Sequence, residues 1–432
     1  MTAGSKGIKS ELIIIFTLLM FVFNTKFIIF GNVFSSYWVF VFGFACFEIF
    51  RFGVNKYFLP YILLTVIATI YALCIHIFFR KDVFETIIFV QILSSIFVLF
   101  SSSVIVRMHI YAYKRKWLDK LIRNLLITAV VNSIFIFGAA SSDGFRDIIY
   151  DFIFITERAT RYAFEMQVHN PRYPGLNVSG FTAGSLLVSL IVLSVSLYSL
   201  HKRGVGIFHY ITLSQVFVVS SLAFVARTGL YLSTLIVTIQ IFRELFLFLK
   251  IPLKMLFVSI LSLGAAMYWI ANLKISHISP MLESQLIDHT GFFWAFEPFV
   301  NYFVGYDLQS TATDALLSEA FLSNDILEIL FGTGILGRAE VYLNSDTGWI
   351  LFISFGGVLG TFILYTPLFY LGISGFCHGF SDFYRRYLLF SIVCLLIVNF
   401  KEIVYLSHGY IQLPMLFFTA GIHSLRTEKS GL

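Results

Sequence analysis

Charged residues are scarce in this sequence. Only 12% of its 432 residues are Asp, Glu, Lys or Arg, whereas soluble domains carry roughly a quarter. Hydrophobic residues make up 58%, and the mean hydropathy is +0.86. So little charge excludes an ordinary soluble fold. A net charge of +6 indicates no nucleic-acid partner, because the basic residues lie between hydrophobic runs, as membrane topology signals do.

Cysteine and metal-binding motifs are also lacking. The four cysteines stand in or beside apolar runs at unrelated spacings, so they predict neither a disulfide framework nor a metal site. No Asp-x-Asp sequence occurs, which argues against an enzyme that holds a nucleotide-sugar through a divalent metal. We therefore expect no metal and no cofactor.

Long hydrophobic runs dominate the chain instead. About twenty residues cross a ~30 Å hydrocarbon core as a helix, which satisfies its own backbone polar groups. The first run lacks a small-residue cleavage site after it, so we expect a retained helix. The fold class predicted is all-α, a polytopic membrane helix bundle of about twelve transmembrane helices. The expected spans are 11–31, 34–50, 59–79, 84–106, 122–140, 180–200, 206–223, 229–249, 253–271, 349–374, 387–404 and 409–425.

The distribution of charge predicts the orientation. With the N-terminus inside, the cytoplasmic segments hold the majority of the Lys and Arg, most densely between Arg107 and Arg123. This bias places both termini in the cytoplasm. Most of the acidic residues fall in two long segments, 141–179 and 272–348, which the same count places outside.

The chain thus divides into five parts. We expect short helices in both outer loops: Asp143, Asp147 and Asp151 share one helix face, and Ser323 can cap a helix that stops at Gly332. The parts are five membrane helices in 1–140, an outer loop in 141–179, four membrane helices in 180–271, a second outer loop in 272–348, and three membrane helices in 349–432.

Three outer arginines stand in glycine-containing contexts at helix ends: Arg172, Arg227 and Arg338. A guanidinium stays charged and offers a planar fork for phosphate, and ionisable groups near membrane depth are often functional. Each also has a plain interpretation. Arg172 and Arg227 can be interfacial anchors that reach towards headgroups, and Arg338 can pair with Glu340.

These arginines belong to three ordered blocks. The first is Arg172-Tyr173-Pro174-Gly175-Leu176, and the second is Ala226-Arg227-Thr228-Gly229. The third combines Phe331-Gly332-Thr333-Gly334, Ser345-Asp346-Thr347-Gly348-Trp349 and Phe355-Gly356-Gly357-Val358-Leu359-Gly360. In order and in their shared outer face, the blocks resemble the O-antigen and capsular polysaccharide polymerases, and more distantly the O-antigen ligases. The likeness extends from about residue 170 to 375, together with the helical plan.

The resemblance implies a metal-independent, inverting glycosyltransferase. It would join oligosaccharide units carried on undecaprenyl pyrophosphate at the periplasmic face of a bacterial inner membrane, in polysaccharide or lipopolysaccharide biosynthesis. The implied partners are the lipid-linked donor and acceptor, membrane lipids and a chain-length regulator. Where the ligases carry a histidine before the Gly-x-x-Gly, this chain has Asp346, so it departs from the ligase pattern.

The site residues expected are as follows. The catalytic set is Asp346, Arg172 and Arg227, and the pyrophosphate-binding set is Arg172, Arg227, Arg338, Arg161 and Arg158. Asp346 can act as a general base, as the N-cap of the following helix, or as both. His169 and His289 are the weaker base candidates.

Two other classes stay open. An O-antigen ligase would transfer glycan to lipid A-core, but this chain lacks the ligase histidine. A lipid-linked oligosaccharide transporter would place charge inside the bundle, whereas Lys26, Glu48, Lys401 and Glu402 lie towards the ends of the expected spans.

Overall fold

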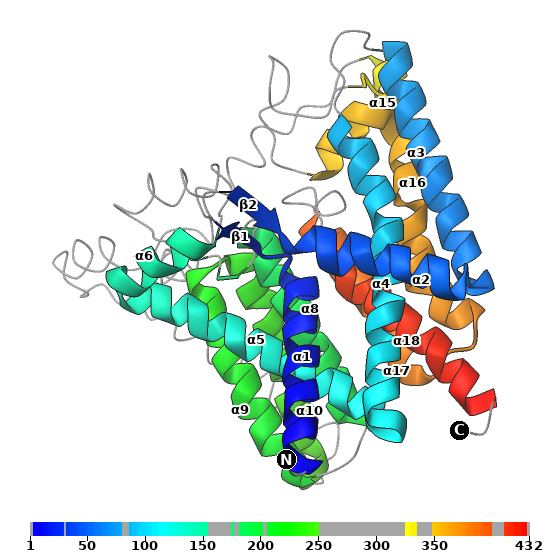
Figure 1. Cartoon of the computed structure of the whole chain (residues 1–432). Helices are drawn as coiled ribbons and strands as arrows, with labels where there is room; N and C mark the ends of the chain where they lie inside the picture. The colour runs from blue at the N-terminus through cyan, green and yellow to red at the C-terminus, as the bar shows by residue number, and fades with distance from the viewer. Residues whose placement is uncertain are drawn as a thin grey trace, which may run out of the picture.

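The chain is mostly helical in the computed structural model (Figure 1). The structure describes residues 3–29, 32–79, 86–153, 173, 175–176, 181–201, 205–249, 325–334, 348–399 and 410–429. The longer helices of the first half are α1 (Ala3–Phe23), α2 (Phe44–Phe52), α3 (Leu59–Phe79), α4 (Thr86–Tyr113), α5 (Trp117–Ser141) and α6 (Asp143–Phe152). Those of the second half are α8 (Phe181–His201), α9 (Val205–Ser221), α10 (Arg227–Leu249), α15 (Ile326–Phe331), α16 (Gly348–Cys377), α17 (Asp382–Val398) and α18 (Gln412–Lys429).

Four stretches are long and apolar enough to cross a membrane, judged by length and composition: Lys56–Ile75, Gln91–Ser141, Ala183–His201 and Trp349–Cys377. The second contains both α4 and α5, which a short 3-10 turn (Lys114–Lys116) separates. Shorter apolar helices lie at Ser10–Phe23, Ile211–Phe224 and Thr228–Arg243. The predicted membrane class is therefore supported, while the number of twelve spans stays a prediction, and the expected span 253–271 lies outside the described residues.

The predicted first two spans differ from the structure. Helix α1 ends at Phe23, and an antiparallel hairpin of β1 (Lys26–Ile29) and β2 (Asn32–Ser35) follows. Asn24 adopts a φ of 47°, which asparagine tolerates better than most residues. The Ser36 N–H then donates to the Thr25 carbonyl at 2.9 Å. Polar residues just after an apolar run thus ended the helix before the predicted residue 31.

A π-helix (Trp38–Gly43) continues directly into α2, and the two hold six and nine residues. Their combined length is below the ~20 residues that cross a bilayer. Figure 1 shows α2 lying across the direction of α1 and α4 instead of parallel to them. This stretch is not among the four candidate spans, and the predicted span 34–50 stays a prediction.

The predicted short helices in the two long loops are confirmed. In the first, Ser142 caps α6 by accepting from the Phe145 N–H at 3.3 Å. In the second, α15 ends at Gly332 as expected, but Asp325 supplies the cap, with its Oδ1 accepting from Leu327 N–H at 2.9 Å. Ser323, the predicted cap, lies outside the described residues.

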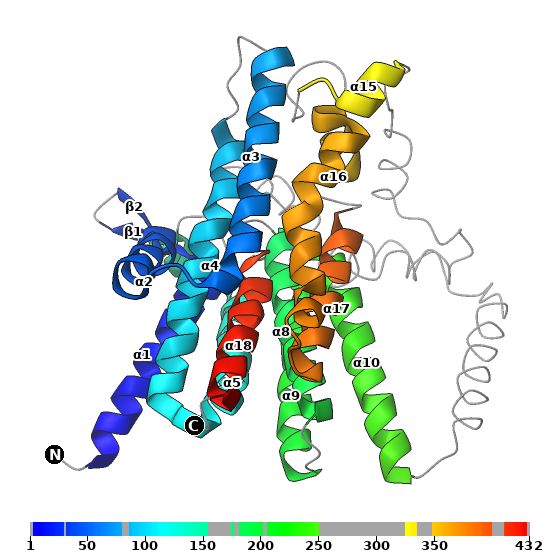
Figure 2. The same ribbon diagram turned by 90° about the vertical axis from the view of Figure 1, so that its right-hand side faces the viewer.

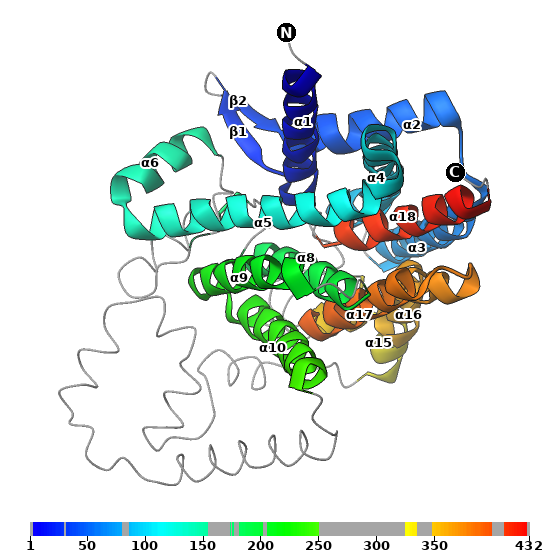
Figure 3. The ribbon, with the colours of Figure 1, turned by 90° about the horizontal axis from the view of Figure 1, so that it is seen from below.

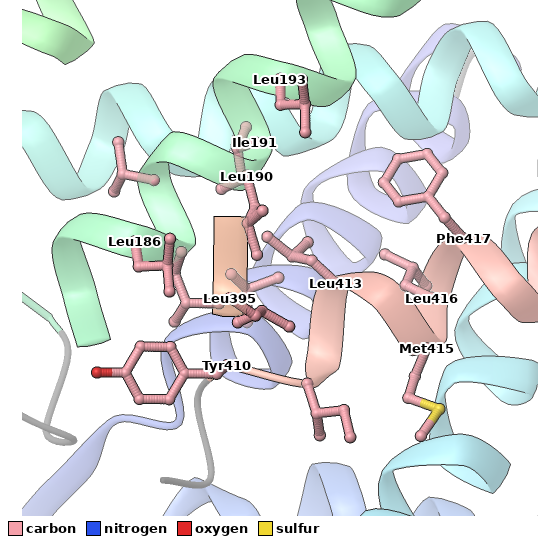
Figure 4. Close-up of a cluster of buried hydrophobic side chains, with 14 of the residues drawn as sticks. Leu186, Leu190, Ile191, Leu193, Leu395, Tyr410, Leu413, Met415, Leu416 and Phe417 are labelled. Atoms are coloured by element: carbon pink, nitrogen blue, oxygen red, sulfur yellow. The ribbon is translucent and has the colours of Figure 1, made fainter. Parts of the chain in front are cut away.

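The helices are staggered along their common direction. Figure 2 shows α3, α15 and the start of α16 rising above the level at which α8 and α10 begin. Seen from below, α5 separates α1, α2 and the hairpin from α8 and α9 (Figure 3). Buried apolar side chains of α8, α17 and α18 fill the centre, among them Leu190, Leu395 and Leu413 (Figure 4).

Candidate functional site

Most of the predicted site residues lie outside the described residues. This holds for Arg158, Arg161, His169, Arg172, His289, Arg338 and Asp346. Arg227 is the first residue of α10, and its backbone alone is described. The structure therefore describes the residues next to these side chains in the sequence, and the contacts of those neighbouring residues are given below.

The described part of the first block is a buried turn held by α5 and by the segment after α1. Leu176 N–H donates to Asn132 Oδ1 of α5 at 2.8 Å, and Thr25 Oγ1 donates to the Leu176 carbonyl at 3.1 Å. Gly175 has a φ of +65°, and a Cβ there would lie 2.5 Å from Asn132 Oδ1. Glycine is required at this position, because a side chain would have both an unfavourable conformation and no space.

A backbone hydrogen bond connects the first block to the second. The Tyr173 N–H donates to the Phe224 carbonyl at 2.9 Å, and Tyr173 itself is buried. Arg172 precedes Tyr173 by one residue and Arg227 follows Phe224 by three. Arg172 lies outside the described residues, so the structure shows here only that Tyr173 contacts the segment that leads into α10.

The second block fixes the start of α10 against α8. A Cβ on Gly229 would lie 2.4 Å from the Ser185 Cβ, so glycine allows the two backbones to approach. Ser189 Oγ donates to the Gly229 carbonyl at 3.0 Å, and Ser233 Oγ donates to Ser189 Oγ at 2.8 Å. Small residues and hydroxyls are the usual means of close helix packing in a bilayer, and here they position the helix that begins with Arg227.

The third block is assembled around a break in α16. Gly357 has a φ of 66°, and the helix is non-helical there. The loop after α15 docks on this break: Thr333 N–H donates to Ser354 O at 2.6 Å, and Gly334 N–H donates to Phe355 O at 2.9 Å. These bonds satisfy carbonyls that the break removes from the helix ladder.

The break folds the first segment of α16 back along the second. The Trp349 and Tyr365 rings stack with centroids 4.8 Å apart, although sixteen residues separate them in the chain. Trp349 Nε1 also donates to the Leu396 carbonyl of α17 at 3.3 Å. The start of α16, two residues after Asp346, therefore lies at the end of α17 that packs on α8 near Leu186 and Leu190 (Figure 4).

Sequence reasoning missed one feature. Glu48 was placed towards the end of an expected span, but it is 2% exposed and paired with Arg107. The sequence could have indicated this pair, because Glu48 is a lone carboxylate in the apolar sequence Phe44-Ala45-Cys46-Phe47-Glu48. Ionisable side chains are costly in apolar surroundings and therefore usually have a partner. Within the described part of the chain, no group of three His, Cys, Asp or Glu side chains is arranged to hold a metal ion.

No family model, no curated protein and no solved structure matches this chain. The resemblance to the O-antigen polymerases therefore rests on the sequence blocks and their order.

Proposed function

We propose that this protein is a membrane glycosyltransferase that polymerises oligosaccharide units carried on undecaprenyl pyrophosphate at the periplasmic face of the inner membrane. The Tyr173–Phe224 hydrogen bond supports this best, because it joins the segments of the two arginines that the proposal needs together. The close packing at Gly175 and Gly229 also supports the proposal, because a side chain at either position would clash with a neighbouring helix. Both glycines belong to the blocks that contain the two arginines.

In this proposal the arginines bind the leaving group. A hydroxyl of the incoming unit attacks the anomeric carbon of the growing chain, and the bond from that carbon to the lipid pyrophosphate breaks. Arg172 and Arg227 stabilise the pyrophosphate that departs with the electron pair, as preorganised electrostatic groups do. Arg338, Arg158 and Arg161 are the further cations proposed to face it.

The acceptor hydroxyl must lose its proton. Asp346 is the proposed base, two residues before the folded-back segment of α16 begins. A carboxylate within hydrogen-bond reach of the hydroxyl accepts that proton. His169 and His289 take this role if Asp346 serves only as the N-cap of α16.

A transporter of lipid-linked oligosaccharides is the second candidate. The observation that favours it is the burial of Glu48 with Arg107, because that class carries charge inside its bundle. The pair joins α2 to α4, and Ser103, which bonds Glu48, also contacts His423 of α18.

The proposed function is tested by replacing Arg227 in cells that depend on this chain for their polymer. Arg227→Lys keeps the charge and loses the planar fork, so we expect shorter polymer. Arg227→Ala loses both, with a rate lower by ~10²–10³. The matched control is Arg243→Ala, an exposed arginine near the opposite end of α10.

Glycan length on gels is compared with the amount of each variant in the membrane. Full-length polymer from well-expressed Arg227→Ala would refute the pyrophosphate role and leave an interfacial anchor. Loss of translocated repeat units, with no unpolymerised units left on the outer face, would favour the transporter.

A further inference from the structure

Basic side chains from several elements gather at the turn that joins α2 to α3. They come from α2, α4, α18 and the short 3-10 helix η2 (Lys56–Phe58) that precedes α3. Figures 1 and 3 show the end of α2, the start of α3 and the end of α18 on the same, right-hand side of the molecule. We call the four side chains the α2–α3 cation cluster: Arg51, Lys56, Arg107 and Arg426.

Contacts with the turn bring these cations together. The guanidinium carbons of Arg51 and Arg107 lie 5.8 Å and 4.0 Å from the centre of the same Phe52 ring. Arg426 Nη2 donates to Asn55 Oδ1 at 2.9 Å, and the fourth cation follows Asn55 directly in the chain. One short turn thus holds cations from helices that are far apart in the sequence.

The cluster carries more positive charge than its surroundings neutralise. Glu48 is paired with Arg107, whose Nε lies 3.0 Å from the carboxylate. Among the described residues, no carboxylate forms an ion pair with the other three cations, and all three are exposed. Arg107 itself keeps 30% of its side chain exposed. Four cations against one carboxylate favour an anionic ligand.

The position of the cluster indicates what kind of anion this is. The candidate membrane span of α3 begins at Lys56, so the turn lies at one end of an apolar helix. Apolar side chains next to the cations are exposed as well: Phe50 is 88% exposed, and Val54 and Leu59 are about half exposed. Such a surface suits a bilayer interface, where apolar groups meet acyl chains and cations meet headgroup phosphates.

The backbone of the turn leaves room for a headgroup. Gly53 ends α2 with a φ of +68°, and its N–H donates to the Ile49 carbonyl at 3.0 Å. A Cβ on Gly53 would meet nothing within 4 Å. The space beside this glycine is therefore open, and a ligand can approach the turn between the cations.

We propose that the α2–α3 cation cluster binds the headgroup phosphate of an anionic glycerophospholipid, whose acyl chains lie against the exposed apolar residues of the turn and of α3. Guanidinium groups suit phosphate oxygens because they present several N–H donors in one plane. The exposed apolar residues favour a lipid over free phosphate. Because α2, α4 and α18 each contribute a cation, the bound headgroup strengthens the contact between these helices. The site is independent of the proposed glycosyl transfer.

Thermal unfolding and native mass spectrometry of the purified full-length protein in neutral detergent test the site. The probes are dioctanoyl phosphatidylglycerol, dioctanoyl phosphatidylcholine, which has the same chains and no net charge, and inorganic phosphate. We expect phosphatidylglycerol alone to raise the unfolding temperature and to stay bound in the mass spectrometer. Equal stabilisation by phosphatidylcholine or by inorganic phosphate would overturn the proposal.

Two double variants that remove the same charge test the location. Each cation near a lipid surface contributes roughly a fivefold gain in binding, so Arg51→Gln with Lys56→Gln should weaken phosphatidylglycerol binding about 20-fold. The control is Arg115→Gln with Lys116→Gln, two exposed cations in the turn between α4 and α5, which should leave binding unchanged.

A milder variant covers the case in which the first pair fails to fold. Lys56→Gln alone should weaken phosphatidylglycerol binding roughly fivefold. An equal loss in both double variants would show general attraction between lipid and basic protein. That result, or unchanged binding in Lys56→Gln, overturns the site at this turn.

Discussion

Asn132 of α5 is one of the residues that hold the described part of the first block in place. It is 1% exposed, and its Oδ1 accepts the Leu176 N–H. The same oxygen fills the space next to Gly175. An amide side chain inside an apolar helix thus has a specific partner, more than forty positions away in the sequence.

We expect Asn132→Ala to destabilise the protein by about 1–3 kcal/mol, because it leaves the buried Leu176 N–H without an acceptor. If the block also positions Arg172, the polymer should shorten more than the amount of protein falls. Thr128→Ala is the control, since the Thr128 hydroxyl bonds Leu125 O within its own helix. Thermal unfolding in detergent and glycan length measure the two effects. Equal behaviour of the two variants would contradict the role of Asn132.

Among single residues, the sequence predicted the structurally important glycines best. The glycines of the three blocks were singled out by their motif context, and Gly175, Gly229, Gly332 and Gly357 all occupy positions that a Cβ would disrupt. It was weakest for Glu48, because burial on α2 depends on α4 and α18, which are distant in the sequence.

At the scale of elements, the break in α16 shows how two distant segments determine one helix. The sequence predicts one membrane span at 349–374, and the hydrophobic run does form helix on both sides of Gly357. The break needs the loop after α15, whose Gly332 would clash with Phe355 O if it carried a Cβ. Tyr71 of α3 adds a third contact by donating to Gly356 O at 3.0 Å.

Gly357→Ala and Gly356→Ala make a matched pair for this element. A Cβ on Gly357 would lie 2.1 Å from the Leu330 carbonyl at a positive φ, so we expect a loss of at least ~1–2 kcal/mol from conformation alone. A Cβ on Gly356 meets only ordinary contacts of 3.5 Å or more, and alanine favours helix by ~0.5–1 kcal/mol. Thermal stability in detergent should fall for Gly357→Ala and not for Gly356→Ala. The opposite order would show that the break is not maintained by this contact.

At the scale of the whole molecule, the charge distribution predicts how the protein is oriented in the membrane. The ends of a long helix allow this orientation to be tested. Helix α5 has 25 residues, about 38 Å at 1.5 Å per residue. Lys116 and Ser142 are exposed residues at its two ends. If α5 spans the bilayer, these two positions face opposite sides.

Single cysteines at Ser142 and Ser310 should react with an impermeant reagent in intact cells, and a cysteine at Lys116 should need permeabilisation. Ser310 lies outside the described residues and tests the second outer loop. The background must lack Cys46, Cys74, Cys377 and Cys394, all of them free thiols. Labelling at Lys116 and protection at Ser142 would reverse the topology and remove the proposed site from the periplasmic face.

The sequence alone determined that this chain is mostly helical, and largely where. Apolar runs of span length have few alternatives, because a backbone without water must satisfy its own N–H and C=O groups. Helix α3 accordingly occupies 59–79, as the run predicts. The start of α8 at Phe181 and of α10 at Arg227 lies within two residues of the predicted positions.

Only the tertiary structure decided the hairpin at Lys26–Ser35, the burial of Glu48, the fold-back of α16 and the contact between the first two blocks. Each depends on a partner that is distant in the chain. Ile153 forms a β-bridge with Phe27 of the hairpin, and His423 contacts Ser103, which bonds Glu48. The Phe355 carbonyl accepts a hydrogen bond from the Gly334 N–H, and the Phe224 carbonyl accepts one from the Tyr173 N–H. Hydrophobic periodicity reports which residues leave water, but not which distant group they meet, because that choice is made by packing and hydrogen bonding in the assembled bundle.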